Sequence, residues 1–200
     1  MECCTPKGRS YQVPILKREP DVYPASIFEI DQPWFVAHVR SRQEKALARY
    51  LQQYEIAYYL PQMEKKTRRN GRTIVSYLPL FGGYVFFKGT ADDSGRAVRS
   101  HLIANLLEPN DQQGLTAELR QLHELQITDK KLVPYPYIGT GDEVMITDGA
   151  FKGFRGVVVR ERGAERLVVS VTFIHQSVAV EVDREFIRPP ARYDSVSAPW

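Results

Sequence analysis

One stretch, from Leu78 to Lys88, constrains the fold of this 200-residue chain more than any other part of its sequence. It reads Leu-Pro-Leu-Phe-Gly-Gly-Tyr-Val-Phe-Phe-Lys and is the most apolar and aromatic run in the chain. Because Gly82 and Gly83 can adopt positive φ at little cost, the run predicts a kink that leaves Phe81 and Tyr84 near the rim of a sheet. A buried strand is expected to follow. Ordinary core packing around a glycine kink is the alternative interpretation.

The composition is that of an ordinary globular chain, with 43% hydrophobic and 26% charged residues. The formal net charge of +3 excludes a polycation, but the charge is unevenly placed. Residues 33–128 carry 13 Lys and Arg against 9 Asp and Glu, whereas residues 138–190 carry 7 against 8. The first region is therefore the better candidate for contact with nucleic acid.

Several classes of protein are disfavoured by what the sequence lacks. Cys3 and Cys4 are adjacent and the four histidines are scattered, so we expect no disulfide framework, no metal site and no cofactor. No apolar run approaches the roughly 20 residues that span a bilayer, and the N-terminus lacks the apolar segment of a signal peptide. Neither a nucleophile motif nor a phosphate-binding loop is present. We expect a cytoplasmic, non-enzymatic protein without catalytic residues and without membrane contact.

The first elements are expected to be a strand and a helix. Pro33 to Arg40 is a short apolar strand, and Ser41-Arg42-Gln43-Glu44 then has the Ser and Glu spacing of a capping box. The helix that begins there carries one apolar stripe at helical spacing, which indicates packing against a sheet. This stripe consists of Leu47, Tyr50, Leu51 and Tyr54.

A basic hairpin is expected next. Ala57 to Lys66 is typical of a strand, and Asn70-Gly71 is a strong signal for a two-residue hairpin turn before the return strand from Thr73 to Leu78. Cations crowd the tip, with Glu64 as the sole acid, which suits salt-dependent contact with phosphates of any sequence. These cations are Lys65, Lys66, Arg68, Arg69 and Arg72. A merely solubilising hairpin tip is the alternative.

The remaining sequence predicts an α+β fold in two parts. A short helix over 92–100, a strand over 103–107 and a helix capped by Thr116, with Leu119, Leu122 and Leu125 inward, complete the first part. The order β-α-β-β-β-α-β-α then predicts a mainly antiparallel sheet flanked by helices.

The expected domain boundaries follow from composition. Residues 32–128 form the first domain, and residues 129–138, with two Lys and a Pro-Tyr-Pro-Tyr run, form a linker. Residues 139–190 alternate apolar and polar positions between glycine turns, which predicts a small all-β, SH3-like barrel. Residues 191–200 form a tail.

Residues 1–31 contain four prolines among mixed charges and predict an extended or disordered arm. Its apolar residues either pack against the first domain or bind a partner, and the sequence favours neither. They are Tyr11, Val13, Ile15, Ile27, Phe28 and Ile30.

Three segments follow one another along the chain: Trp34-Phe35-Val36, Phe81-Gly82-Gly83-Tyr84-Val85 and the glycine-punctuated segment from Gly141 to Gly156. Their order resembles that of the NusG family of transcription elongation factors. That family has an N-terminal NGN domain and a C-terminal KOW domain. The second unit is the more specific match, because Gly141 to Ile146, Asp148 to Phe151 and Gly156 to Val158 look like the KOW signature. The resemblance covers residues 33–189.

The resemblance implies a factor that binds the clamp helices of RNA polymerase through an apolar patch and promotes processive elongation. The residues that it places at this patch are Trp34, His38, Tyr54, Phe81, Tyr84 and Phe86. Arg40, Arg42 and Lys45 match the place where specialised members touch the non-template DNA strand, and the five hairpin cations join them as candidate nucleic-acid contacts.

Two departures from the family pattern indicate a specialised paralogue. Gly82 stands where the family usually has proline, and Ile174-His175-Gln176 stands where housekeeping members have a Phe-Gly-Arg type turn. In the family this turn contacts a small-subunit ribosomal protein or Rho, so Phe173, Ile174, His175 and Gln176 are the candidate KOW contacts. We expect a monomer acting in antitermination on specific long operons. A ribosome-associated RNA-binding protein with a KOW module is the alternative.

Overall fold

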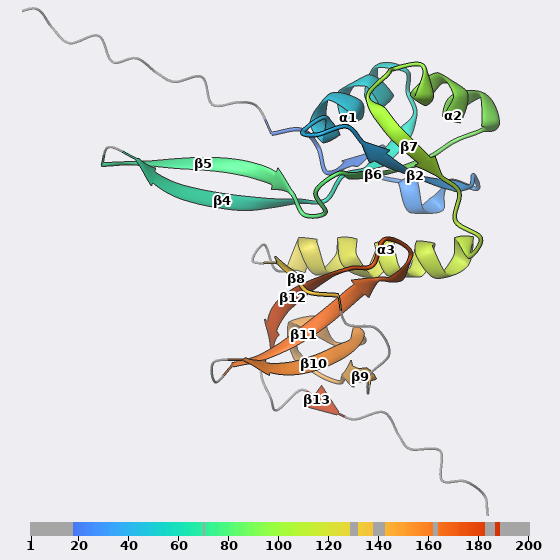
Figure 1. Ribbon diagram of the computed structural model, residues 1–200. Coiled ribbons are helices and arrows are strands. Elements are labelled where there is room, and N and C mark those ends of the chain that lie inside the picture. The colour runs from blue at the N-terminus through green and yellow to red at the C-terminus, as the bar shows by residue number, and fades with distance from the viewer. Residues whose placement is uncertain are drawn as a thin grey trace, which may run out of the picture.

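The computed structural model describes residues 18–69, 71–128, 132–137, 143–161, 164–182 and 187–188 of the chain. Figure 1 shows a helix-covered sheet above and a second, all-β unit below, with helix α3 between them. The expected tail, residues 191–200, lies outside the described residues, as do residues 1–17 of the expected arm.

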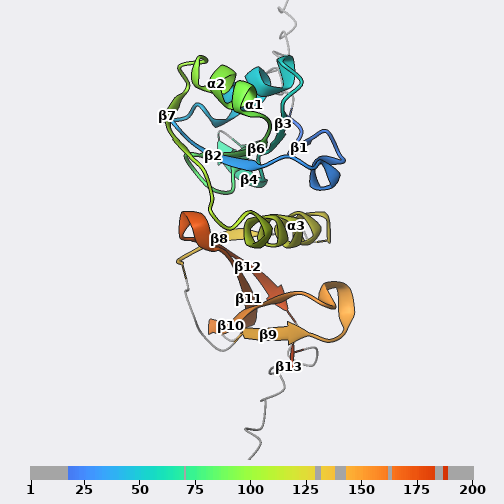
Figure 2. The ribbon, with the colours of Figure 1, turned by 90° about the vertical axis from the view of Figure 1, so that its right-hand side faces the viewer.

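The first domain is built on a five-stranded antiparallel sheet. Its strand order is β1 (Val22–Tyr23), β3 (Ala57–Tyr59), β6 (Tyr84–Lys88), β2 (Trp34–Val39) and β7 (Ile103–Leu107). Figures 1 and 2 show helices α1 (Glu44–Gln53) and α2 (Ala91–Val98) on one face and α3 (Gln112–Thr128) on the other. The expected antiparallel sheet flanked by helices is confirmed.

Alternation along β2 explains why both faces of the sheet are covered. Phe35, Ala37 and Val39 enter the apolar cluster under α1 and α2, whereas Trp34 and Val36 enter the cluster under α3. A strand that is apolar on both sides needs a layer on each face.

The basic hairpin is a separate two-stranded sheet of β4 (Gln62–Arg69) and β5 (Arg72–Pro79), which projects from the body in Figure 1. Arg69 pairs with Arg72, so the connection has two residues, and Gly71 has φ +74°, as the Asn-Gly signal predicts. The single strand expected from Ala57 to Lys66 is wrong. Leu60 and Pro61 separate β3 from β4, because proline has no N–H to continue the ladder.

Helix α1 differs from the expected capping box. The N-cap position is Gln43, which makes no capping hydrogen bond, and the Glu44 carboxylate instead accepts a hydrogen bond from the N–H of Gly83 at 2.8 Å. The apolar stripe predicted for this helix is also only partly buried. Leu47 and Leu51 are fully buried, but Tyr54 is 42% exposed.

Helix α3 begins at Gln112, four residues before the expected cap at Thr116. The Asp111 carboxylate accepts a hydrogen bond from the N–H of Gly114 at 2.7 Å, so it caps this end of the helix. The leucines that were expected to point inward, at positions 119, 122 and 125, are all buried.

The N-terminal segment is folded from residue 18 onward, so the expected arm is shorter than residues 1–31. Val22 pairs with Tyr59, a 3-10 turn covers Ile27–Glu29, and the Ile27 side chain is completely buried. Phe28 and Ile30 pack against the same apolar cluster, which favours packing on the first domain for these residues.

The second domain is an all-β unit, as expected, with six antiparallel strands. Their order is β13 (Ile187–Arg188), β9 (Glu143–Ile146), β10 (Arg155–Glu161), β11 (Ala164–Val171), β12 (Gln176–Val182) and β8 (Val133–Tyr135). Strand β8 comes from the expected linker, which is therefore shorter than residues 129–138. Pro134 is tolerated there because β8 is an edge strand.

Among the described residues no helix has the length and apolar character that crossing a membrane requires.

Candidate interaction surfaces

The double-glycine run forms a tight turn at the end of the sheet. The Tyr84 N–H donates a hydrogen bond to the Phe81 carbonyl at 3.2 Å, and Gly83 has φ +86°. Positive φ at the third residue of a four-residue turn is typical of type II. The turn is tied to β2, because the Val39 N–H donates to the Gly83 carbonyl at 2.8 Å.

The expectation that Phe81 lies near the rim of the sheet is wrong. Phe81 and Trp34 are each 1% exposed and Phe86 is fully buried, so these three rings belong to the interior. Phe81 meets Phe86 edge to face at 6.2 Å. The cause is α3, which covers this face of the sheet: Trp34 Nε1 donates to Thr116 Oγ1 at 3.0 Å.

The outer edge of the same face remains accessible. His38 is exposed and Tyr84 is partly exposed, and their rings lie 5.2 Å apart at the end of β2 and β6. A Cβ at Gly83 would lie 3.5 Å from the His38 ring, so the turn approaches this pair closely. Of the six residues proposed for the polymerase patch, five therefore gather on the α3 side of the sheet.

Tyr54 is the sixth, and the structure does not bring it to the others. It lies at the end of α1, on the opposite side of the sheet, where its ring is 4.7 Å from Tyr50 and under the Arg96 guanidinium at 5.4 Å. The family resemblance places Tyr54 in the patch, but the fold puts it on the other face of the sheet.

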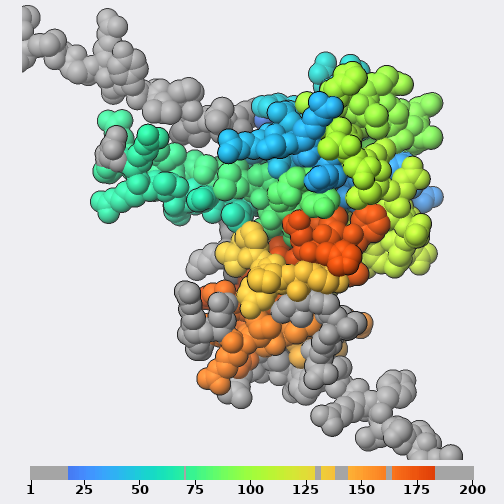
Figure 3. Space-filling model, viewed as in Figure 1, coloured from blue at the N-terminus to red at the C-terminus, as the bar shows by residue number. Residues whose placement is uncertain are grey.

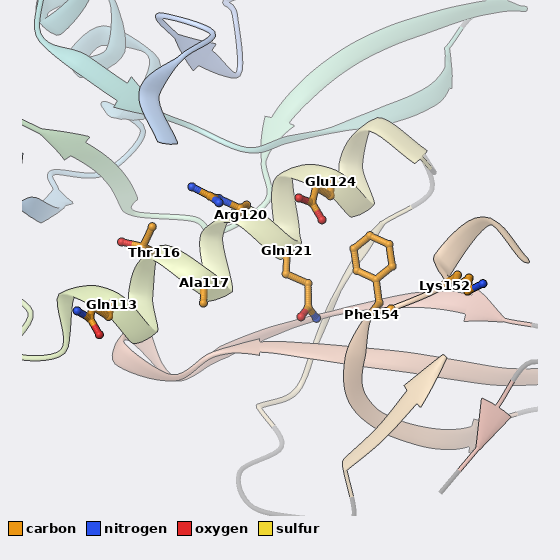
Figure 4. Close-up of a pocket in the computed structure, with 9 residues that line it drawn as sticks. Gln113, Thr116, Ala117, Arg120, Gln121, Glu124, Lys152 and Phe154 are labelled. Carbon is orange, nitrogen blue, oxygen red and sulfur yellow. The ribbon is translucent and has the colours of Figure 1, made fainter. Parts of the chain in front are cut away.

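Helix α3 also contacts the barrel with its other side. Glu118 Oε2 accepts a hydrogen bond from the Thr172 N–H at 3.0 Å, and the Gln121 side-chain amide donates to the Arg155 carbonyl. Burial raises the pKa of Glu118, against the lowering effect of its hydrogen bonds with Thr172. Between α3 and the barrel lies an open cavity of about 550 Å³, and Figure 4 shows Gln121 and Phe154 at its walls.

The expected partner-binding turn of the barrel lies at the contact between α3 and the barrel. It forms a 3-10 turn, Thr172–Ile174, in which Phe173 is partly buried and Ile174 is buried against the cluster that includes α3. His175 is exposed in the left-handed conformation, 5.0 Å from the Tyr137 ring, and Gln176 begins β12. In Figure 3 this orange-red segment abuts the green surface of the first domain.

The candidate nucleic-acid residues differ in their exposure and in their contacts. Arg40 and Arg42 are exposed at the junction of β2 and α1, whereas Lys45 is half-buried and donates to the Tyr77 carbonyl at 2.7 Å. Lys45 therefore supports the base of the hairpin. The five hairpin cations are all exposed, but the strand register divides them between two faces.

Sequence reasoning missed the polar residues that fix α3. Gln126 Nε2 donates to Asp21 Oδ2 and to the Gln62 carbonyl, each at 2.9 Å, while its Oε1 accepts from the Tyr59 hydroxyl at 3.2 Å. Burial raises the pKa of Asp21 in this network, against the lowering effect of Arg18. A glutamine on an amphipathic helix carries no sequence signal for such a role.

His123 is the histidine with the most enclosed surroundings among the described residues. It lies between Phe28, stacked at 5.3 Å, and Tyr59, edge-on at 5.7 Å, and burial lowers its pKa. Among the described residues, no group of three or more His, Cys, Asp or Glu side chains could hold a metal ion.

Comparison with known proteins gives two family matches. Residues 32–120 match the family described as "Transcription termination factor nusG", and residues 140–160 match the KOW motif. A structure described as "Domain interaction in Thermotoga maritima NusG" aligns with 80% of this chain and 97% of its own, at 16% identity and a TM-score of 0.46. The two family matches fall separately on the first domain and on the barrel.

Proposed function

Because the chain belongs to the NusG family of transcription elongation factors, we propose that it binds the clamp helices of RNA polymerase through the α3 side of its first domain. The family is known to interact with RNA polymerase and its members are non-enzymatic. The observation that carries the proposal is the His38–Tyr84 pair, which forms an accessible aromatic edge beside the buried Trp34, Phe81 and Phe86. Aromatic anchors in a small patch contribute most of the binding energy in many protein interfaces.

Access to this surface is limited in the arrangement of Figure 1. The Trp34 ring is hydrogen-bonded to α3, the Phe81 ring is buried in the same apolar cluster as the leucines of α3, and the barrel contacts the outer side of α3. The polymerase would therefore meet the His38–Tyr84 edge first. Contact with the outer side of α3 requires that the barrel be displaced.

The finer parts of the proposal concern other partners. Arg40 and Arg42 are exposed where a specialised member would touch the non-template strand, and His175 is the accessible part of the barrel turn that would meet a ribosomal protein or Rho. With Gly82 in place of proline, these features favour a specialised antitermination factor, acting as a monomer in the cytoplasm on long operons. The first domain, which includes β1, and the barrel, which includes β8, would carry the two sets of contacts.

The test is binding of RNA polymerase by a Tyr84→Ala variant. We expect affinity to fall by at least about fivefold, because truncation of an anchoring aromatic costs more than about 1 kcal/mol at such surfaces. Binding would be measured by titrating labelled protein with core polymerase. Phe81→Ala is unsuitable, because removing a fully buried Phe destabilises the fold by about 3–5 kcal/mol.

Tyr54→Ala is the matched control, because Tyr54 is an exposed tyrosine of the same domain on the opposite side of the sheet. We expect its affinity to stay within about twofold of wild type. Equal affinities of the two variants would contradict the proposed surface. Firm binding to vacant ribosomes without binding to polymerase would contradict the proposed function.

A further inference from the structure

The register of the β4–β5 hairpin divides its side chains into two faces of different chemistry. Residues paired across an antiparallel ladder point to the same face, and successive residues alternate. One face, here named the cationic face, carries Lys65, Thr67, Arg69, Arg72, Ile74 and Leu78. The other, here named the mixed face, carries Glu64, Lys66, Arg68, Thr73, Val75 and Tyr77.

Some side chains of the mixed face make contacts within the protein itself. Glu64 forms an ion pair with Lys66 at 3.0 Å, and the Arg18 guanidinium lies over the Tyr77 ring at 4.7 Å. The N-terminal segment thus covers the base of this face. Glu64 and Lys66 thus neutralise each other and Tyr77 has Arg18 as its partner, whereas Arg68 takes part in none of the ion pairs found in the described part of the chain and Val75 is 42% exposed.

The cationic face is different. It holds three cations and no acid among its described residues, and none of the ion pairs found in the described part of the chain uses Lys65, Arg69 or Arg72. Ile74, which is 49% exposed, lies between these cations, and Leu78, which is 36% exposed, lies beyond Lys65 toward the base of the hairpin. Positive charge interleaved with exposed aliphatic surface indicates a binding face whose partner is both acidic and apolar.

This chemistry favours a protein partner over nucleic acid. Proteins that bind single strands combine cations with aromatic rings on which bases stack, and the described residues of the cationic face include no ring. A phosphate backbone would leave Ile74 and Leu78 exposed to water. Acidic side chains around an apolar patch on a protein would engage both kinds of group.

The position of the face points to the same partner as the proposed function. At the base of the hairpin, Met63 pairs with Leu78 and packs against the cluster that contains Trp34 and Phe81. The cationic face therefore begins on the α3 side of the sheet. Resting on the proposed function, we infer that this face docks on an acidic, partly apolar protein surface of RNA polymerase.

Site-specific photocrosslinking tests the inference. The photoreactive residue p-benzoylphenylalanine replaces either Thr67 or Thr73, which are exposed threonines on opposite faces of the same hairpin. With a reconstituted elongation complex, we expect position 67 to crosslink to a polymerase polypeptide and position 73 to give at least about fivefold less of that product. Crosslinking of position 67 to DNA or RNA, equal yields from both positions, or no product at position 67 would overturn the inference.

A second pair of variants tests the apolar contribution. Ile74→Ser and Val75→Ser change neighbouring β-branched residues of similar exposure on opposite faces, so their effects on hairpin stability are matched. We expect Ile74→Ser to weaken polymerase binding by about tenfold and Val75→Ser by less than about twofold. Equal effects would overturn the inference.

Failure of the inference can be separated from failure of the proposed function. If the unsubstituted protein does not bind polymerase, both fail. If it binds and Tyr84→Ala weakens binding while the hairpin variants behave alike, only the inference about the cationic face fails.

Discussion

Gly82 is the residue at which this chain departs from the family pattern within the Phe81–Tyr84 turn. It is exposed at the second position of a type II turn, where proline is favoured because its ring fixes φ near −65°. A Cβ at Gly82 would meet no atom within 4 Å. The turn thus forms in this chain with a residue that has more conformational freedom to lose on folding.

We predict that Gly82→Pro stabilises the protein by about 0.4–1 kcal/mol, because proline restricts the unfolded chain more than the folded one. The midpoint of urea unfolding would measure the change. Gly83→Ala is the control and should destabilise, because Gly83 has φ +86° and faces the His38 ring. A destabilising Gly82→Pro would contradict the assignment of the turn as type II.

At the scale of elements, the sequence predicted those whose pattern is local. The Asn-Gly hairpin, the apolar strands β2 and β6 and the leucines of α3 all have such patterns, and the structure confirms them. Strands β1 and β8 were missed because two or three residues carry no periodicity and pair only through tertiary contact. For the candidate site, the glycine run and the family resemblance predicted Phe81 and Tyr84, but the burial of Phe81 depends on partners distant in sequence.

The start of α1 shows how a tertiary contact replaces a local motif, and it gives a prediction. Glu44→Ala should destabilise the protein by about 1 kcal/mol or more, because the partly buried Gly83 N–H loses its acceptor. Ser41→Ala should change the free energy of unfolding by less than about 0.5 kcal/mol, since Ser41 is exposed and caps nothing. Chemical denaturation of both variants measures these changes in the free energy of unfolding. Similar losses from the two would support the capping box instead.

At the scale of the whole molecule, α3 is the shared layer between the two domains. One apolar cluster runs from Trp34 and Phe86 in the sheet, through Leu119 and Leu122 of α3, to Ile174 in the barrel. Packing on both sides makes α3 the element through which a change in one domain would reach the other. The polar contacts of Glu118 and Gln121 fix the barrel on it.

We predict that Glu118→Ala loosens the barrel from α3, because the Thr172 N–H loses a charge-assisted acceptor. Amide hydrogen exchange at Thr172, followed by NMR, should accelerate by about tenfold. Glu118→Gln keeps an acceptor oxygen and should exchange more slowly than Glu118→Ala. Glu124→Ala removes an exposed carboxylate of the same helix, which lines the cavity but does not bond Thr172, and should leave the rate unchanged. An unchanged rate in Glu118→Ala would contradict the contact.

Strand β8 also determines how far the barrel can travel. While Val133–Tyr135 stays paired with β12, only the chain between Thr128 and Val133 joins α3 to the barrel. At full extension this linker spans about 17 Å. If β8 detaches, the tether runs to Glu143 and reaches about 50 Å. The pairing of this three-residue strand therefore sets the length of the linker. With β8 paired, the barrel can only rotate beside α3. With β8 detached, the barrel can reach a partner on the far side of a large complex.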